Sequence, residues 1–178
     1  MSAEDTPYRL ELQSVHTQAL GHALGEEITA GQVIALSGNL GAGKTTFTQG
    51  LAAGMGIEDI VTSPTFTLVN EYGDDASLRL IHIDTYRLDE LPGEAILESE
   101  TFGLDEILDP DNLVETGDSG AVVVIEWAER IAPLLPEDHL QIEIGPDRDP
   151  QLRNVVCTAY GPVSASLLQS AIDRLTAR

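Results

Sequence analysis

Lysine is almost absent from this chain of 178 residues, and the shortage is part of a strong excess of acid. Nine basic residues stand against 30 acidic ones, which gives a formal net charge of −21, and Lys44 is the single lysine. So negative a chain disfavours direct binding to the phosphate backbone of nucleic acids at ordinary ionic strength. An acid-rich surface with little lysine fits a protein adapted to high salt, where repulsion between like charges is screened.

Cysteine, aromatic residues and long apolar runs are scarce as well. The one cysteine, Cys157, cannot form an internal disulfide, and its apolar neighbours predict an inert buried thiol. With 4% aromatic but 42% hydrophobic residues, the core must consist mainly of Leu, Ile, Val and Ala. No apolar run approaches the ~20 residues of a membrane span, and residues 1–10 lack the pattern of a signal peptide. These absences predict a single domain over residues 1–178, cytoplasmic and without a membrane partner.

What the chain does contain is a glycine-rich stretch of characteristic spacing. Residues 38–45 read Gly-Asn-Leu-Gly-Ala-Gly-Lys-Thr, which is G-x-x-x-x-G-K-[ST], between an apolar run at 33–36 and an expected helix. Glycines let backbone N–H groups reach phosphate oxygens, and the helix start adds the positive end of its dipole. Lys44 is then expected to reach the β- and γ-phosphates, and Thr45 to offer its hydroxyl to Mg²⁺. A chain that avoids lysine elsewhere but places one here indicates that this ammonium group has a function.

Hydrophobic periodicity predicts an α/β order of elements around this stretch. Strands are expected at 8–12, 32–37, 65–72, 78–84, 121–125, 139–144 and 154–160, and helices at 15–27, 44–53, 94–99, 103–108 and 127–135 and near the C-terminus. Ser14 and Ser164 are expected to cap the first and last helices. Strands joined by the short turn at 73–75 should be antiparallel, and the stretch at 109–120 is typical of an acidic, solvated loop.

Two carboxylates and one threonine are candidates for the rest of a nucleotide site. A phosphate loop needs an acid near the metal, usually at the end of a buried strand. Glu126 ends the most apolar run and Asp84 ends the strand at 78–84. Either could instead be a solvated or capping group, but the glycine loop favours a site. Thr65 lies where switch-type threonines of nucleotide hydrolases sense the γ-phosphate, with an ordinary turn residue as the alternative.

Further absences narrow the nucleotide chemistry. A guanine-reading Asn-Lys-x-Asp motif is impossible, because the only lysine lies in the glycine loop, so a small GTPase is excluded. Small-molecule kinases usually carry an arginine-rich lid, whereas Arg148 and Arg153 are the only nearby pair in a loop. The four histidines show no metal-binding spacing. Two alternatives to an ATP hydrolase stay open: a small P-loop kinase, and a binding module whose nucleotide state only controls docking.

Four segments, in order, resemble the TsaE family, also called YjeE, which comprises bacterial ATPases of tRNA threonylcarbamoyladenosine synthesis. They are Gly-Asn-Leu-Gly-Ala-Gly-Lys-Thr-Thr-Phe at 38–47, Ser-Pro-Thr-Phe-Thr-Leu at 63–68, His-Ile-Asp-Thr-Tyr-Arg-Leu at 82–88 and Val-Ile-Glu-Trp at 124–127. The resemblance implies an α/β fold: a single P-loop NTPase-like domain with a mixed, mainly parallel central sheet flanked by helices. It also implies binding of ATP with Mg²⁺ and weak hydrolysis to ADP and phosphate by the protein alone. The implied partners are the TsaD and TsaB proteins, which modify ANN-decoding tRNAs, so that tRNA is met only indirectly.

Residue roles are carried over from these motifs. The implied phosphate-binding residues are Gly41, Ala42, Gly43, Lys44, Thr45 and Thr46. Thr45 and Glu126 are the implied Mg²⁺ ligands. The implied catalytic set comprises Lys44, Asp84 as the catalytic or water-positioning acid, and Thr65 at the γ-phosphate end.

The remaining family positions are less defined. Trp127 follows Glu126 as in the family and either packs over the strand end or contacts a partner. Tyr86 and Arg87 match the pattern without a role that physics assigns. The resemblance also places the adenine near residues 14–17 and Arg153 at the nucleotide. The acidic stretch at 109–120 and the very negative surface depart from the family, which questions partner affinity at ordinary salt rather than the nucleotide site.

Overall fold

Strands β2 and β5 form the middle of the sheet because their sequences are almost wholly apolar. The computed structural model describes residues 8–73, 78–88, 102–114 and 120–177. In it β2 (Val33–Ser37) and β5 (Gly120–Glu126) run parallel, with Ile34 opposite Val124. Nearly every residue of the two strands is buried, as expected for parallel strands that are covered on both faces.

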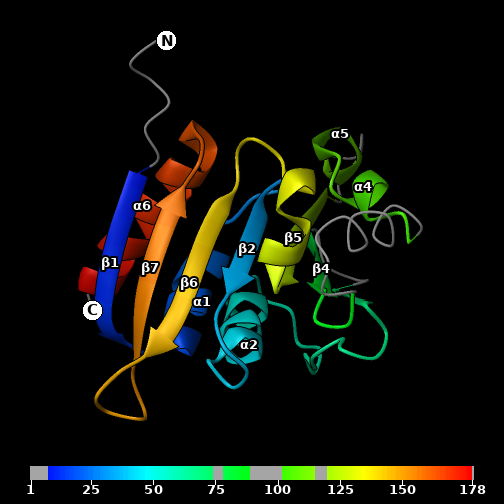
Figure 1. Cartoon of the computed structure of the whole chain (residues 1–178). Helices are drawn as coiled ribbons and strands as arrows, with labels where there is room; N and C mark the ends of the chain where they lie inside the picture. The colour runs from blue at the N-terminus through cyan, green and yellow to red at the C-terminus, as the bar shows by residue number, and fades with distance from the viewer. Residues whose placement is uncertain (1–7, 74–77, 89–101, 115–119, 178) are drawn as a thin grey trace.

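Seven strands lie in the order β1-β7-β6-β2-β5-β4-β3 (Figure 1). The outer members and their neighbours are β1 (Tyr8–Val15), β3 (Val69–Tyr72), β4 (Leu78–Asp84), β6 (Leu140–Pro146) and β7 (Arg153–Ala159). The central strands β6, β2, β5 and β4 are mutually parallel, whereas β7 and β3 are antiparallel to their neighbours. The predicted fold class is confirmed, together with the predicted antiparallel pairs β3–β4 and β6–β7.

Helices cover both faces of this sheet. They are α1 (Thr17–Gly25), α2 (Lys44–Gly54), α4 (Leu104–Ile107), α5 (Pro110–Leu113), the 3₁₀ helix η1 (Ala128–Leu134) and α6 (Pro162–Thr176). On one face α1, α2 and α6 pack against Ile34 and Leu36, and on the other α4, α5 and η1 pack against Val33 and Ala35 (Figure 1). Since side chains alternate along a strand, β2 contributes to two separate cores.

Helices α1 and α2 pack so closely that their contact requires glycine. A Cβ atom at Gly21 would lie 2.2 Å from the carbonyl oxygen of Phe47, and one at Gly50 would lie 2.1 Å from that of Gln18. Any larger residue would therefore push the helices apart. This contact fixes the position of α2 and of the glycine loop before it.

Neither predicted cap residue is the N-cap of its helix. Helix α1 begins at Thr17, while Ser14 lies in β1 with a φ of 58° and donates its hydroxyl to Oδ2 of Asp147 at 2.9 Å. The local pattern predicts this hydroxyl as a helix cap, but it is instead hydrogen-bonded to a residue 133 positions away. Ser164 is the third residue of α6 rather than its cap, and its Oγ accepts a hydrogen bond from the Gly161 N–H at 3.2 Å.

Other boundaries differ by less. The strand expected from residue 65 begins at Val69, because residues 65–67 form a turn in which the Leu68 N–H donates to the Pro64 oxygen at 2.7 Å. Part of the expected acidic loop is helical, as α5. The helix expected at 94–99 and the segment 115–119 lie outside the described residues, as does most of the turn at 73–75.

The single thiol lies in the core. Cys157 has no exposed surface, and burial raises the pKa of its thiol to about 12, in agreement with the predicted inert role. Within the described ranges, no helix has the length and apolar character that crossing a membrane requires.

Candidate active site

The glycine loop leaves the carboxyl end of β2 and leads directly into α2. Gly38 and Gly43 have φ values of 139° and 110°, which L side chains rarely adopt, so the tight path depends on glycine. Gly43 is the N-cap of α2, and its carbonyl accepts the first helical hydrogen bond from Phe47 at 2.8 Å. The backbone N–H groups that follow have no partner within the helix, and they lie at the positive end of its dipole. This end of α2 is built to receive an anion.

Lys44 is buried at the start of α2. Its side chain folds back so that Nζ donates to the carbonyl oxygens of Gly38 at 2.7 Å and Asn39 at 3.2 Å. The ammonium group also lies 3.8 Å from the ring centroid of Trp127, a cation–π distance. Burial lowers the pKa of Lys44, while the nearby carboxylates of Glu126, Glu129 and Asp84 raise it in part. The ammonium group is thus held in place and partly removed from water.

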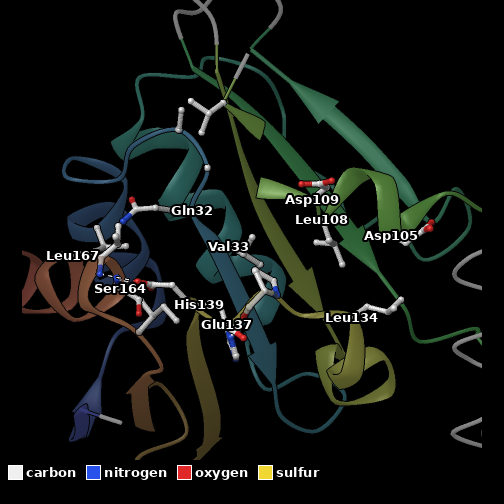
Figure 2. A pocket seen from close by; sticks show the side chains of 17 residues that line it. Gln32, Val33, Asp105, Leu108, Asp109, Leu134, Glu137, His139, Ser164 and Leu167 are labelled. Carbon is white, nitrogen blue, oxygen red and sulfur yellow. Dashed lines mark hydrogen bonds between the residues drawn. The ribbon is translucent and has the colours of Figure 1, made fainter. Parts of the chain in front are cut away.

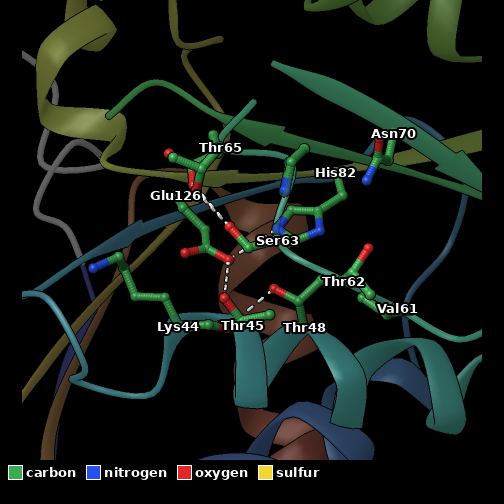
Figure 3. Close-up of polar contacts among 12 residues, drawn as sticks. Lys44, Thr45, Thr48, Val61, Thr62, Ser63, Thr65, Asn70, His82 and Glu126 are labelled. Atoms are coloured by element: carbon green, nitrogen blue, oxygen red, sulfur yellow. Dashed lines mark hydrogen bonds and ion pairs between the residues drawn. The ribbon is translucent and has the colours of Figure 1, made fainter. Parts of the chain in front are cut away.

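Glu126 and Asp84 lie side by side because β5 and β4 are parallel neighbours in register. The two residues are paired at the carboxyl ends of their strands. One oxygen of Glu126, Oε1, lies 2.8 Å from the Thr45 Oγ1 that donates to it and 2.9 Å from Nε2 of His82. Figure 3 shows Thr45, His82 and Glu126 gathered at this point, from α2, β4 and β5.

Asp84 holds the turn that precedes β3. Its Oδ2 accepts hydrogen bonds from the hydroxyls of Thr65 at 2.6 Å and Ser63 at 3.0 Å, and its Oδ1 accepts the Tyr86 N–H at 2.9 Å. The two hydroxyls are also 2.7 Å apart. Hydrogen bonds to a charged carboxylate are about twice as strong as neutral ones. Asp84 therefore fixes residues 63–65, at the start of this turn, beside the glycine loop.

The chain is strained immediately after Glu126. Trp127 has a φ of 60° and a ψ of 36°, a left-handed conformation that costs ~1–2 kcal/mol in a non-glycine residue. Thr85 stabilises it by donating its hydroxyl to the Trp127 oxygen at 2.7 Å. The Trp127 ring also lies 5.1 Å from that of Tyr86. Such strain persists where the surroundings hold it, and it places the indole over Lys44.

All of the predicted site residues line one cavity of about 340 Å³. Its walls are Leu40, Gly41, Ala42, Gly43, Lys44, Thr45, Thr46, Ser63, Thr65, Asp84, Tyr86, Glu126 and Trp127. Sequence reasoning missed two contributors. One is Ser63, whose place in the Ser-Pro-Thr-Phe-Thr-Leu segment was a usable signal. The other is His82, to which histidine spacing gave no role, although it lies two residues before Asp84 on the same face of a strand.

A magnesium ion fits the oxygen atoms at this cavity. Thr45 supplies a hydroxyl and Glu126 a carboxylate within hydrogen-bonding distance of each other. Mg²⁺ is usually held by one or two carboxylates together with substrate phosphates, rather than by a cage of protein ligands. Accordingly, the described ranges contain no group of three or more His, Cys, Asp or Glu residues suited to holding a metal by themselves.

The residues of the less defined predictions lie at different distances from the glycine loop. Arg153 donates from Nε to the carbonyl oxygen of Ala42 at 2.8 Å, so it contacts the glycine loop. A Cβ atom at Gly43 would lie 3.1 Å from Oγ1 of Thr17, which places the start of α1 beside the loop. Ser14 is instead bonded to Asp147. Contact of any of these residues with a nucleotide stays a prediction.

A second, larger cavity lies at the opposite end of the sheet, near the amino ends of β2 and β6 (Figure 2). It measures about 690 Å³ and is lined by apolar side chains such as Val33 and Leu108, with Asp105 and Glu137 among its acids. No lysine or arginine is among the described residues that line it. The described lining therefore offers no cationic side chain to a phosphate.

A phosphate loop between β2 and α2, with acids at the ends of the neighbouring parallel strands, defines the class of P-loop α/β domains. The chain belongs to the TsaE family: residues 12–155 match the family model for the threonylcarbamoyl adenosine biosynthesis protein TsaE.

Individual relatives agree with this assignment. The tRNA threonylcarbamoyladenosine biosynthesis protein TsaE of Bacillus subtilis is 41% identical over 145 residues, covering 82% of this chain and 80% of the relative. The protein of the same name from Streptomyces coelicolor is 39% identical over 148 residues, covering 80% and 89%. The crystal structure of YdiB from Bacillus subtilis superposes with a TM-score of 0.70 at 31% identity, covering 95% of this chain and 97% of that one.

Proposed function

We propose that the protein hydrolyses ATP to ADP and phosphate, with Mg²⁺, as a step of tRNA threonylcarbamoyladenosine modification. The observation that carries the proposal is the convergence of Lys44, Thr45, Asp84 and Glu126 on one cavity at the start of α2. The names of the relatives supply the pathway. As in the family that the sequence resembles, we propose TsaD and TsaB as cytoplasmic partners, with tRNA met only through their complex.

The glycine loop would bind the triphosphate. Backbone N–H groups of residues 41–46 and the dipole of α2 face the phosphates, and Lys44 exchanges its loop carbonyl partners for phosphate oxygens. Trp127 packs against the ammonium group and keeps water from it. Because Lys44 is already buried, its charge acts on the phosphates through a medium less polar than water.

Thr45 and Glu126 would hold Mg²⁺ next to the phosphates. When bound, the ion neutralises charge on the β- and γ-oxygens. The protein's own contribution is to keep the Thr45 hydroxyl and the Glu126 carboxylate in place before the nucleotide arrives. Such preorganisation supplies most of the rate in phosphoryl transfer.

Asp84 and Thr65 would act at the γ-phosphate end. Asp84 is buried and lines the cavity, with Thr65 bound to its Oδ2. In this arrangement Asp84 orients the attacking water or accepts its proton, and Thr65 holds the γ-phosphate end of the site.

The test is ATP turnover with and without the cognate TsaD and TsaB proteins. We expect weak turnover by the protein alone, a clear rise on adding both partners, and a loss of nearly all ATP-dependent activity in Lys44→Ala. Turnover that the partners leave unchanged would contradict the proposal. If ATP labelled in its γ-phosphate transfers the label to a product other than phosphate, the protein is instead a kinase. Arg153 is already bonded to the carbonyl oxygens of Ala42 and Pro150, which weakens the case for an arginine lid.

The variant Glu126→Ala tests whether tRNA modification needs ATP turnover or only nucleotide-controlled docking to the partners. Under the proposal this variant stops turnover and with it the sustained modification of tRNA. If tRNA modification continues without ATP turnover, the protein is a nucleotide-gated binding module.

A further inference from the structure

His82 is a buried histidine next to the candidate site, at a strand position where an apolar residue is usual. It occupies β4 two residues before Asp84, and its side chain is 0% exposed. Leu80, two positions earlier on the same face, is an apolar core residue. A buried polar group costs free energy unless it is paired, so an apolar residue would be expected at position 82.

Among the residues that the structure describes, the one polar partner of His82 is Glu126. Its Nε2 lies 2.9 Å from Oε1 of Glu126, while Nδ1 is buried and has no hydrogen-bond partner among the described residues. Because a carboxylate oxygen only accepts, Nε2 must carry the hydrogen. A neutral ring with the hydrogen on Nε2 leaves only a lone pair, not an N–H group, unpaired at Nδ1. His82 is thus the donor of this hydrogen bond and Glu126 is the acceptor.

The two donors to Glu126 differ in what else they can do. Thr45 lines the cavity and is available to a ligand, whereas His82 is not among the lining residues. Both donate to Oε1, and the described residues give Oε2 no hydrogen-bond partner. His82 is therefore the donor that continues to hold Glu126 when a ligand engages Thr45, and Oε2 is the oxygen left to face the cavity.

We propose that His82 is a positioning residue that orients the Glu126 carboxylate for Mg²⁺. The inference rests on the proposed function, since it assigns Glu126 to the metal. His82 does not touch the nucleotide or the ion. Removing the partner that orients a metal ligand typically lowers metal affinity ~10–100-fold, which makes the effect measurable.

The experiment compares His82→Leu with His82→Gln, whose amide nitrogen can take the place of Nε2. Binding of a fluorescent ATP analogue is titrated with Mg²⁺ and repeated in EDTA, and thermal unfolding is recorded for each variant. We expect His82→Leu to raise the Mg²⁺ concentration at half-saturation ~10-fold. Its affinity for the nucleotide in EDTA should stay within ~2-fold, and His82→Gln should restore most of the loss.

His139→Leu is the matched control. This histidine lies at the opposite end of the sheet, where Nδ1 is 2.7 Å from the Pro136 oxygen. This histidine is half-buried and likewise has a hydrogen-bonded ring nitrogen, and its replacement should leave the Mg²⁺ dependence unchanged.

Each result decides the proposal. A folded His82→Leu with the Mg²⁺ dependence of the wild type overturns it, as does equal weakening in EDTA, because a merely structural role would predict that. If His82→Leu does not fold, His82→Gln is compared with His82→Asn, whose shorter amide does not reach Glu126; equal Mg²⁺ dependence of these two overturns the proposal. A wild-type protein whose nucleotide binding ignores Mg²⁺ overturns the proposed function as well, which distinguishes the two failures.

Discussion

The two ends of the central sheet carry cavities of opposite character. At the carboxyl ends of β2, β4 and β5 the cavity measures about 340 Å³ and is surrounded by Lys44, Thr45, Asp84 and Glu126. At the amino ends the cavity is about twice as large, at about 690 Å³, and is mainly apolar with acids among its lining residues. Of these two cavities, the larger is the one without the phosphate-binding residues. In open α/β sheets, ligands bind beyond the carboxyl ends, where loops and helix N-termini gather.

The two ends of the sheet also differ in the polar side chains that they bury. Lys44, His82, Asp84, Thr85 and Glu126 are all buried at the carboxyl end, and each makes at least one hydrogen bond there. Burying so many polar groups is costly unless they are paired, and a left-handed Trp127 adds strain. At the amino end, Ser164 is the buried polar residue of the lining. Buried, paired polar groups and a strained backbone thus gather at the carboxyl end, as is common at functional sites.

Lys44→Ala is expected to have the largest effect on ATP turnover and so to show the difference between the two ends most clearly. Loss of the ammonium group should lower ATP turnover ~10³-fold, because it removes a preorganised charge from the phosphates. Steady-state phosphate release measures this. Glu137→Ala, which removes an exposed charge at the amino-end cavity, is the control and should retain full turnover. Equal losses in the two variants would break the comparison.

Asp84→Asn should lower turnover ~10²-fold while nucleotide affinity changes little. The amide keeps the shape of the carboxylate but loses its charge and its ability to accept a proton. Single-turnover kinetics with Mg²⁺ and ATP measure the chemical step. The matched acid at the other end is the exposed Asp105, and Asp105→Asn should behave as the wild type. A normal chemical step in Asp84→Asn would remove Asp84 from the catalytic set.

Thr65→Val tests whether the turn is held by Asp84. The hydroxyl donates to Asp84 at 2.6 Å, and a hydrogen bond to a charged group is worth ~1.5–3 kcal/mol. A double-mutant cycle with Asp84→Asn, read by urea unfolding, should recover a coupling energy of that order. The control is Thr67→Val. Thr67 lies in the same turn, but its hydroxyl donates to Asn70, so this variant should show no coupling to Asp84. Coupling of the same size in both cycles would mean that the effect is not specific to the site.

Nucleotide affinity should decrease at alkaline pH earlier than an ordinary lysine would predict. Burial lowers the pKa of Lys44 from 10.5, and phosphates bind the protonated form. As pH rises through the lowered pKa, the free protein loses its ammonium group and the affinity decreases, whereas below that pKa it is constant. Burial also lowers the pKa of His139, but at the other end of the sheet, so its titration should leave nucleotide affinity unchanged. Affinity that is constant up to the usual lysine range would contradict the burial of this charge.

Salt is expected to give the smallest effect, and it acts on the acidic surface. With a net charge of −21, molar KCl should screen repulsion and raise the midpoint of thermal unfolding by ~3 °C or more, about 1 kcal/mol for a domain of this size. Differential scanning calorimetry in dilute buffer and in 2 M KCl checks this. Equal stability in the two solutions would remove the high-salt hypothesis without touching the site.

Much of this molecule followed from its sequence. The glycine loop, the strand ends at Asp84 and Glu126, and the position of Thr65 were predicted from spacing, and the structure brings them to one cavity. These predictions rested on local patterns. An apolar run specifies a buried strand, and the carboxyl ends of parallel neighbours must meet at one edge of the sheet.

Only the tertiary structure decided which side chains meet. Ser14 is a good helix cap by its sequence, yet Asp147 takes its hydroxyl, and neither residue signals the other along the chain. The contact between His82 and Glu126 spans 44 residues, and it depends on the register of β4 against β5. Local sequence determines the period and ends of an element, because those depend on neighbouring residues. Hydrogen-bond partners far apart in sequence are set by how whole elements pack, which no short pattern contains.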